Sequence, residues 1–101
     1  MPKKLPAIDS QHLLQFLTGL LNTPSPTGRT AQAIEYVEDA LQGLPGVRFQ
    51  RTRKGALLVT LPGVGEDAPR ALTAHVDTLG AMVKQIKSSG RLELSMLGGY
   101  S

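Results

Sequence analysis

The spacing of apolar residues changes at Val47, and this change constrains the fold more than any other feature of the 101-residue chain. Before Val47, apolar residues recur every three or four positions, as on one face of a helix. The first predicted helix starts at a capping residue, Asp9 or Ser10, and places on one face Leu13, Leu14, Leu17, Leu20 and Leu21. The prolines of NTPSPTG (residues 22–28) end it. A second helix, predicted to start between Thr27 and Thr30, carries Ile34, Val37, Leu41 and Leu44 and ends at GLPG (residues 43–46).

After Val47 the apolar residues alternate with polar ones or form short runs, as in β-strands. Residues 47–53 and 56–61, joined by the turn signal Lys54-Gly55, predict a β-hairpin. Residues 70–75 (RALTAH) predict a buried strand. Residues 80–87 and 91–97, joined by SSG, predict a second hairpin. The order of helices and strands predicts a mixed α/β fold.

The composition excludes several kinds of site and partner. The chain has no cysteine, which excludes disulfides, thiolate zinc clusters and thiol nucleophiles and fits a reducing compartment. No apolar stretch approaches the roughly 20 residues that a membrane span needs, and the first residues do not resemble a signal peptide. We therefore expect a cytoplasmic protein with no membrane partner. The basic cluster Arg48, Arg51, Arg53 and Lys54 has one aromatic neighbour, Phe49, and favours a solvated strand edge over a nucleic-acid surface.

His75 and Asp77 are the main candidates for a functional site. Residues two apart in an extended chain share a face, so the Asp77 carboxylate can reach the His75 ring. A metal-bound imidazole needs such a partner, because one ring nitrogen binds the ion while the other donates its N–H to a carboxylate. The position after a predicted strand supports a ligand site. Spacing alone favours the simpler alternative, a satisfied histidine beside a turn-forming aspartate.

Three other candidates are weaker. His12 lies in the first turn of the first predicted helix with no acidic partner nearby, which indicates a surface histidine. Ser25 has no base beside it and no nucleophile-elbow pattern around it, so it is expected to be a turn residue. The Gly-Val-Gly of residues 63–65 lacks the third glycine and the following helix of a nucleotide-binding loop.

Three segments of the sequence also resemble a known protein family. LLNTPSPTGRTAQAIEYVEDAL, KGALLVTLPG and ALTAHVDTLGAMVKQIKSSGRLELSMLGGYS resemble the start of metallopeptidase family forty-two. That family comprises glutamyl, deblocking and tetrahedral aminopeptidases and proteins with endoglucanase-like names. The resemblance runs from about Leu13 to Ser101 and is most specific in AHVDTLGAMVK and LGGY.

The resemblance implies a hydrolase that removes amino-terminal residues from peptide substrates, with two divalent ions, zinc or cobalt, in an α/β peptidase domain. Carried over to this sequence, His75 is a metal ligand and Asp77 orients it. Residues 1–83 would be the amino-terminal part of the catalytic domain, and residues 84–101 the truncated start of an inserted β-rich dimerisation domain. The other metal ligands of the family have no counterpart here. We therefore expect a fragment of a longer homo-oligomeric enzyme, inactive by itself and unable to hold the ions tightly.

One position departs from the family pattern, and two alternatives stay open. Many members have a glutamate after the motif aspartate, whereas this chain has Thr78. A related family of di-metal carboxypeptidases and deacylases often has threonine there, although GAMVKQIK and LGGY favour the aminopeptidases. The substrate preference stays open for the same reason. The other alternative is a stand-alone, non-catalytic module that binds or assembles through its exposed hairpins.

Overall fold

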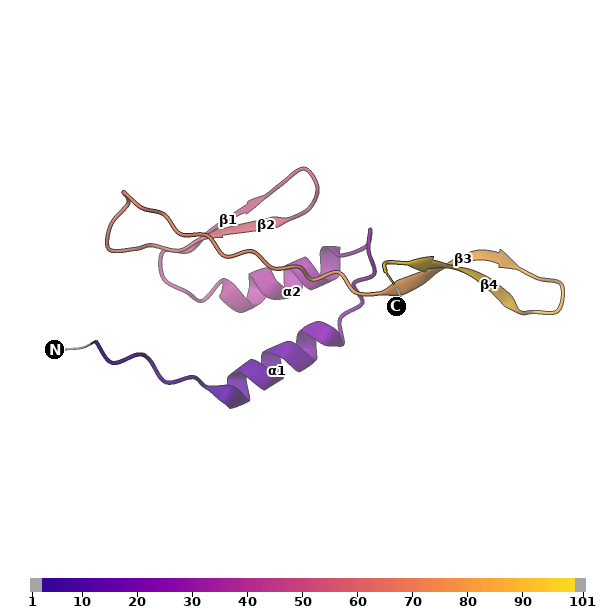
Figure 1. The fold of residues 1–101 in the computed structure, drawn as a ribbon, viewed down its shortest axis with the longest axis horizontal. Coiled ribbons are helices and arrows are strands. Elements are labelled where there is room, and N and C mark those ends of the chain that lie inside the picture. The colour runs from indigo at the N-terminus through magenta and orange to yellow at the C-terminus, as the bar shows by residue number, and fades with distance from the viewer. Residues whose placement is uncertain (1–2, 100–101) are drawn as a thin grey trace.

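The computed structural model describes residues 3–99, which form two helices and two separate β-hairpins (Figure 1). The elements are α1 (Ser10–Leu21), α2 (Ala31–Leu41), β1 (Arg48–Arg51), β2 (Leu57–Thr60), β3 (Gly80–Ile86) and β4 (Leu92–Leu97). Both predicted helices and both predicted hairpins are confirmed. The fold is therefore a mixture of helices and strands, as the spacing of apolar residues indicates.

Helix α1 begins where the sequence offers a capping side chain. The Asp9 carboxylate accepts a hydrogen bond from the backbone N–H of His12 at 3.0 Å. The Asp9 carbonyl accepts the first helical hydrogen bond, from the N–H of Leu13 at 3.1 Å. A side-chain oxygen in this position satisfies a donor that the helix itself leaves without a partner. Of the two predicted caps, Asp9 is therefore the one that the chain uses.

The two helices meet through an aromatic pair. The rings of Phe16 and Tyr36 lie 5.4 Å apart between centroids, and the Tyr36 hydroxyl donates to the Phe16 carbonyl at 3.2 Å. Gly19 makes room for this ring, because a Cβ there would lie 2.8 Å from the Tyr36 Cζ. The predicted leucine stripe of α1 is largely uncovered by described residues: Leu13, Leu14, Leu17 and Leu21 are 43–65% exposed.

An ion pair joins the first hairpin to α2. Arg51, at the end of β1, donates from Nε to the Glu38 carboxylate at 3.0 Å and makes a second contact through Nη2. The hairpin itself pairs Arg48 with Thr60 and Arg51 with Leu57. One member of the basic cluster is therefore balanced within the chain, by a partner 13 residues away.

The second hairpin has two chemically different faces. Residues directly opposite in an antiparallel pair share a face, and the register contains a bulge between Val83 and Gln85. One face therefore carries only apolar side chains: Ala81, Val83, Ile86, Leu92, Leu94 and Met96. On the other face Glu93 lies 3.2 Å from the Lys84 ammonium and 3.5 Å from that of Lys87. Among the described residues nothing covers the apolar face, where Ile86 and Met96 are well exposed.

The prediction of a buried strand at residues 70–75 is wrong for the described chain. No described strand pairs with these residues, and Leu72 is fully exposed, at 101%. Figure 1 shows the segment as part of a long extended run, in orange, between the first hairpin and β3. A strand needs a neighbour to take its backbone hydrogen bonds. Without one among residues 3–99, the apolar run ALTA faces solvent.

Little apolar surface is buried in the described part of the chain. Its only buried residues are Ala33 and Ser25, and the radius of gyration is 18.8 Å. A compact domain of this length would have a radius of gyration of about 13 Å. Neither described helix has the length and the apolar content needed to cross a membrane.

The predicted domain boundary between residues 83 and 84 falls inside β3, at its bulge. The division of the chain into two domains stays a prediction. The last residues of the LGGYS motif, Tyr100 and Ser101, lie outside the described residues, as do Met1 and Pro2.

The contact between Gly19 and Tyr36 gives a test of the helix packing. Alanine inside a helix is normally more favourable than glycine by about 1 kcal/mol. At Gly19, however, the added methyl group would overlap the Tyr36 ring, and overpacking of this kind costs about 1–3 kcal/mol. We expect Gly19→Ala to lower the midpoint of thermal unfolding, followed by helical circular dichroism. Gly43→Ala, where a Cβ would have no neighbour within 4 Å, serves as the control and should leave the midpoint equal or higher. Equal midpoints for the two variants would contradict the packing of the Tyr36 ring against Gly19.

Candidate functional site

The structure brings His75 and Asp77 into direct contact. The Nδ1 atom of His75 lies 2.9 Å from the Asp77 Oδ1 atom and 3.2 Å from the Asp77 carbonyl oxygen. Both neighbours are hydrogen-bond acceptors, so the neutral imidazole carries its proton on Nδ1. Its Nε2 atom is then left with a free lone pair. The His75 side chain is 83% exposed, which leaves Nε2 accessible to a ligand.

A residue from a distant part of the chain completes the contacts of Asp77. The Thr27 hydroxyl donates to the Asp77 Oδ2 atom at 3.1 Å, across 50 positions of sequence. Both carboxylate oxygens therefore hold a hydrogen bond. These bonds lower the pKa of the Asp77 carboxyl below its ordinary value of 3.8, with the bond to His75 as the largest cause and the bond to Thr27 as the next. Sequence reasoning did not find Thr27, because nothing in its local pattern points to residue 77.

The loop that precedes α2 holds the His75–Asp77 segment in place. Its residues Ser25, Pro26 and Thr27 are here called the 25–27 clamp. The Ser25 carbonyl accepts from the Thr78 backbone N–H at 2.7 Å and from the Thr78 hydroxyl at 3.2 Å. Pro26 and Thr78 form a parallel β-bridge. Thr78, the residue that departs from the family pattern, therefore uses its side chain to bind the clamp.

Pro26 packs closely against the start of β3. A Cβ added to Gly80 would lie 2.8 Å from the Pro26 Cβ atom, which belongs to a rigid ring. Glycine at position 80 therefore allows the clamp to approach the chain just beyond Thr78. Thr27 contacts residue 77, Ser25 and Pro26 both contact residue 78, and Pro26 also packs against residue 80.

Two residues considered in the sequence lie outside any catalytic arrangement. Ser25 is 2% exposed, and its hydroxyl has no hydrogen-bond partner among the described residues. A serine nucleophile needs a base within hydrogen-bond reach, so the structure gives Ser25 a place in the loop and no sign of activation. His12 is exposed at the start of α1, where its backbone N–H binds Asp9.

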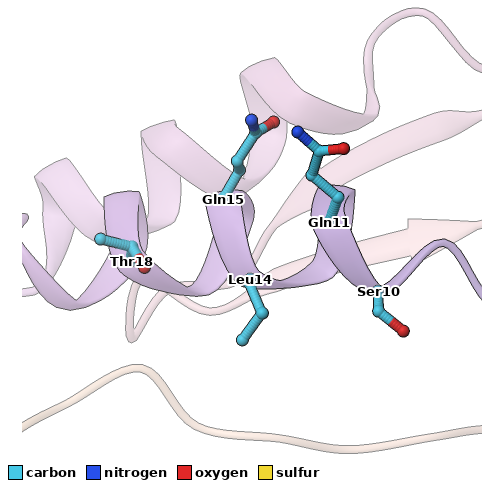
Figure 2. Close-up of a pocket in the computed structure, with 5 residues that line it drawn as sticks. All are labelled: Ser10, Gln11, Leu14, Gln15 and Thr18. Carbon is cyan, nitrogen blue, oxygen red and sulfur yellow. The ribbon is translucent and has the colours of Figure 1, made fainter.

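A hollow on the surface of α1 is a separate feature. It is lined by Ser10, Gln11, Leu14, Gln15 and Thr18, all from this one helix (Figure 2). Figure 2 shows Gln11 and Gln15 on one side of the helix and Leu14 on the other. The lining contains no titratable side chain and no metal ligand, so the hollow carries no catalytic assignment.

The donor atoms at His75 fit one position of a metal site. The exposed Nε2 atom, with its ring fixed through Nδ1, is the arrangement that an imidazole ligand uses. Within residues 3–99, however, no group of three or more histidine, cysteine, aspartate or glutamate side chains could hold an ion. The roles predicted for His75 and Asp77 therefore need further ligands from beyond the described residues.

The contact between Asp77 and His75 predicts a specific pH dependence. Because the folded pKa of Asp77 is lowered, its contribution to stability is complete above the ordinary value of 3.8 and is lost as the pH falls through the lowered value. We expect His75→Ala to raise the pKa of the Asp77 carboxyl, since the largest cause of the shift is removed. The measurement is the pH dependence of the Asp77 carboxyl carbon signal in NMR spectra. His12→Ala removes the other histidine and should leave that titration unchanged; an equal effect of both variants would contradict the contact.

Two comparisons relate this chain to known proteins. Residues 55–101, which include His75 and Asp77, match the model of the M42 glutamyl aminopeptidase family. Over 87 residues the chain is 47% identical to a protein of Bacillus subtilis (strain 168) named "Putative aminopeptidase YhfE". That alignment covers 86% of this chain and 25% of the relative, so the chain spans about a quarter of the relative's length. By these two matches, the chain belongs to the M42 glutamyl aminopeptidase family.

Proposed function

We propose that this chain supplies one metal ligand, His75, to a metal-dependent aminopeptidase that removes amino-terminal residues from peptides. The observation that carries the proposal is the 2.9 Å contact between His75 Nδ1 and Asp77 Oδ1, which leaves Nε2 free to bind an ion. The family match and the name of the Bacillus subtilis relative support the reaction class. The ions of such an enzyme would be zinc or cobalt.

Each residue has a distinct part in this proposal. His75 binds the ion through Nε2, and Asp77 holds the ring and raises the basicity of the ligand atom. The pKa of the Asp77 carboxyl lies below its ordinary value of 3.8, so the group is an ionised carboxylate in the neutral range and accepts the hydrogen bond from the Nδ1–H of His75. Divalent ions, when bound, supply Lewis-acid polarisation of the peptide carbonyl.

The proposal extends to the organisation of the whole protein. A catalytic zinc ion usually needs three protein ligands, and the described residues offer one histidine supported by one aspartate. The remaining ligands would come from further chain, with residues 1–83 in the catalytic domain and residues 84–101 opening an inserted β-rich domain. The apolar face of the β3–β4 hairpin supports a role for that insertion in subunit contacts. The assembled enzyme would be a cytoplasmic homo-oligomer.

The related carboxypeptidases and deacylases are the less favoured alternative. Their link to this chain is Thr78, and the structure engages that side chain in a hydrogen bond to the Ser25 carbonyl. The family match is to the aminopeptidases, and it covers the segment around Thr78.

The shortage of ligands predicts that the 101-residue chain alone has no peptidase activity. Purified chain, supplied with zinc or cobalt, should release no amino acid from an amino-terminal chromogenic peptide above the metal-only rate. Hydrolysis that a chelator abolishes would contradict this expectation.

The role of His75 is tested in the longer protein, whose extent is established by reading the coding sequence past Ser101. We expect His75→Ala to lower kcat/KM by at least about 100-fold and to reduce the bound metal per subunit, because a ligand is lost. Asp77→Asn should lower kcat/KM and the bound metal per subunit by less, since the ligand atom of His75 remains. His12→Ala, at an exposed site away from the pair, is the matched control. Full activity of His75→Ala would refute the proposed function.

A further inference from the structure

The segment that contains His75 and Asp77 has no sheet to hold it in the described structure. Residues 70–77 pair with no described strand, and the Asp77 side chain is 44% exposed. A carboxylate at such a position is free to rotate away from the imidazole unless another contact fixes it. The contacts that fix it come from the 25–27 clamp, which is remote in sequence.

We propose that Thr27 is a positioning residue for the His75 ligand, acting through Asp77. The Thr27 hydroxyl holds Oδ2 at 3.1 Å, and this leaves Oδ1 facing His75 Nδ1 at 2.9 Å. The two hydrogen bonds fix the plane of one carboxylate from opposite oxygens. This inference deepens the proposed function and rests on it for the role of the metal.

Neighbouring contacts fix the donor as well as the acceptor. Thr27 follows Ser25, whose carbonyl binds Thr78 through two hydrogen bonds, and Pro26, which packs against Gly80. The backbone on both sides of the Thr27–Asp77 bond is therefore held in register. These contacts place the Thr27 side chain within reach of Asp77, where its hydroxyl donates to Oδ2 at 3.1 Å.

The chemical consequence concerns which ring nitrogen carries the proton. An imidazole without a partner distributes its proton between both nitrogens, whereas a fixed carboxylate at Nδ1 places it there and leaves Nε2 free for an ion. Loss of the Thr27 hydroxyl releases Oδ2 and lets the carboxylate turn. The Nδ1–H group then keeps only the Asp77 carbonyl oxygen, at 3.2 Å, as a fixed acceptor. The advantage of the Nδ1-protonated tautomer therefore falls, and ions bind more weakly.

The first experiment measures the tautomer of His75 in the longer protein after its metal has been removed. Long-range proton–nitrogen NMR spectra, recorded at a pH where His75 is neutral, report the protonated nitrogen directly. We expect Nδ1–H in the wild type and a shift toward Nε2–H in Thr27→Val, which keeps the branched shape but removes the hydroxyl. Thr27→Ser, which restores a hydroxyl, should return the wild-type tautomer.

Ser25→Ala is the matched control within the same loop. The clamp uses the Ser25 carbonyl, and the Ser25 hydroxyl has no partner, so this variant should keep the wild-type tautomer. The backbone amide signal of Thr78 reports whether the clamp is intact. Thr27→Ala gives a second removal of the hydroxyl if Thr27→Val disturbs the loop. An unchanged tautomer in an intact variant, or loss of the Thr78 signal in both variants, would overturn the positioning role.

The second experiment measures zinc affinity in the longer protein by competition with a chromogenic chelator. Partners of a ligating histidine typically contribute about 10–100-fold to metal affinity, and for Thr27→Val we expect about 10-fold, with Thr27→Ser close to wild type. In the Asp77→Asn background, Thr27→Val should have no further effect. A changed tautomer with no change in zinc affinity would overturn the link to metal binding. Full activity of His75→Ala would instead refute the proposed function and leave the Thr27–Asp77 contact standing.

Discussion

The structure depends on the hydrogen bond from the Thr78 N–H to the Ser25 carbonyl. This 2.7 Å bond joins the loop between the helices to the extended run that leads into β3. It is part of a parallel β-bridge, the one isolated bridge within the described chain. The two helices contact each other through Phe16 and Tyr36, and each hairpin is held by pairing between its own two strands. The bridge connects the early part of the chain to the residues that form the candidate site.

Around that bridge, three residues of one loop meet three positions of one extended segment. Each contact has a different physical basis: a side-chain hydrogen bond from Thr27, a doubly used carbonyl at Ser25, and steric fit of the Pro26 ring on Gly80. Together they replace the sheet neighbours that the segment lacks within residues 3–99. The geometry of His75 and Asp77 is therefore set by the loop, and the spacing of the two residues only makes the contact possible.

The sequence predicts well those features whose causes are local. Asp9 caps α1 within three residues of its partner, Lys54-Gly55 turns the first hairpin, and alternation defines β3 and β4. The spacing of His75 and Asp77 predicts that their side chains can meet, because residues two apart in an extended chain share a face. Residues 70–75 have the composition of a buried strand but find no partner among the described residues, because strand formation depends on neighbours that composition does not specify. The sequence does not predict the role of Thr27 for the same reason, since its hydrogen-bond partner Asp77 lies 50 residues away.

The bulge in β3 has a consequence for how the second hairpin gains stability. By shifting the register between Val83 and Gln85, it gathers six apolar side chains on one face and leaves the lysine–glutamate pairs on the other. A two-stranded hairpin is at best marginally stable alone in water. A surface that binds the apolar face of the folded hairpin, and not the unfolded chain, stabilises the hairpin. The gain in the free energy of unfolding grows with the logarithm of the concentration of that surface. The fraction of this hairpin that is folded therefore depends on the concentration of the covering surface and on its affinity for the apolar face.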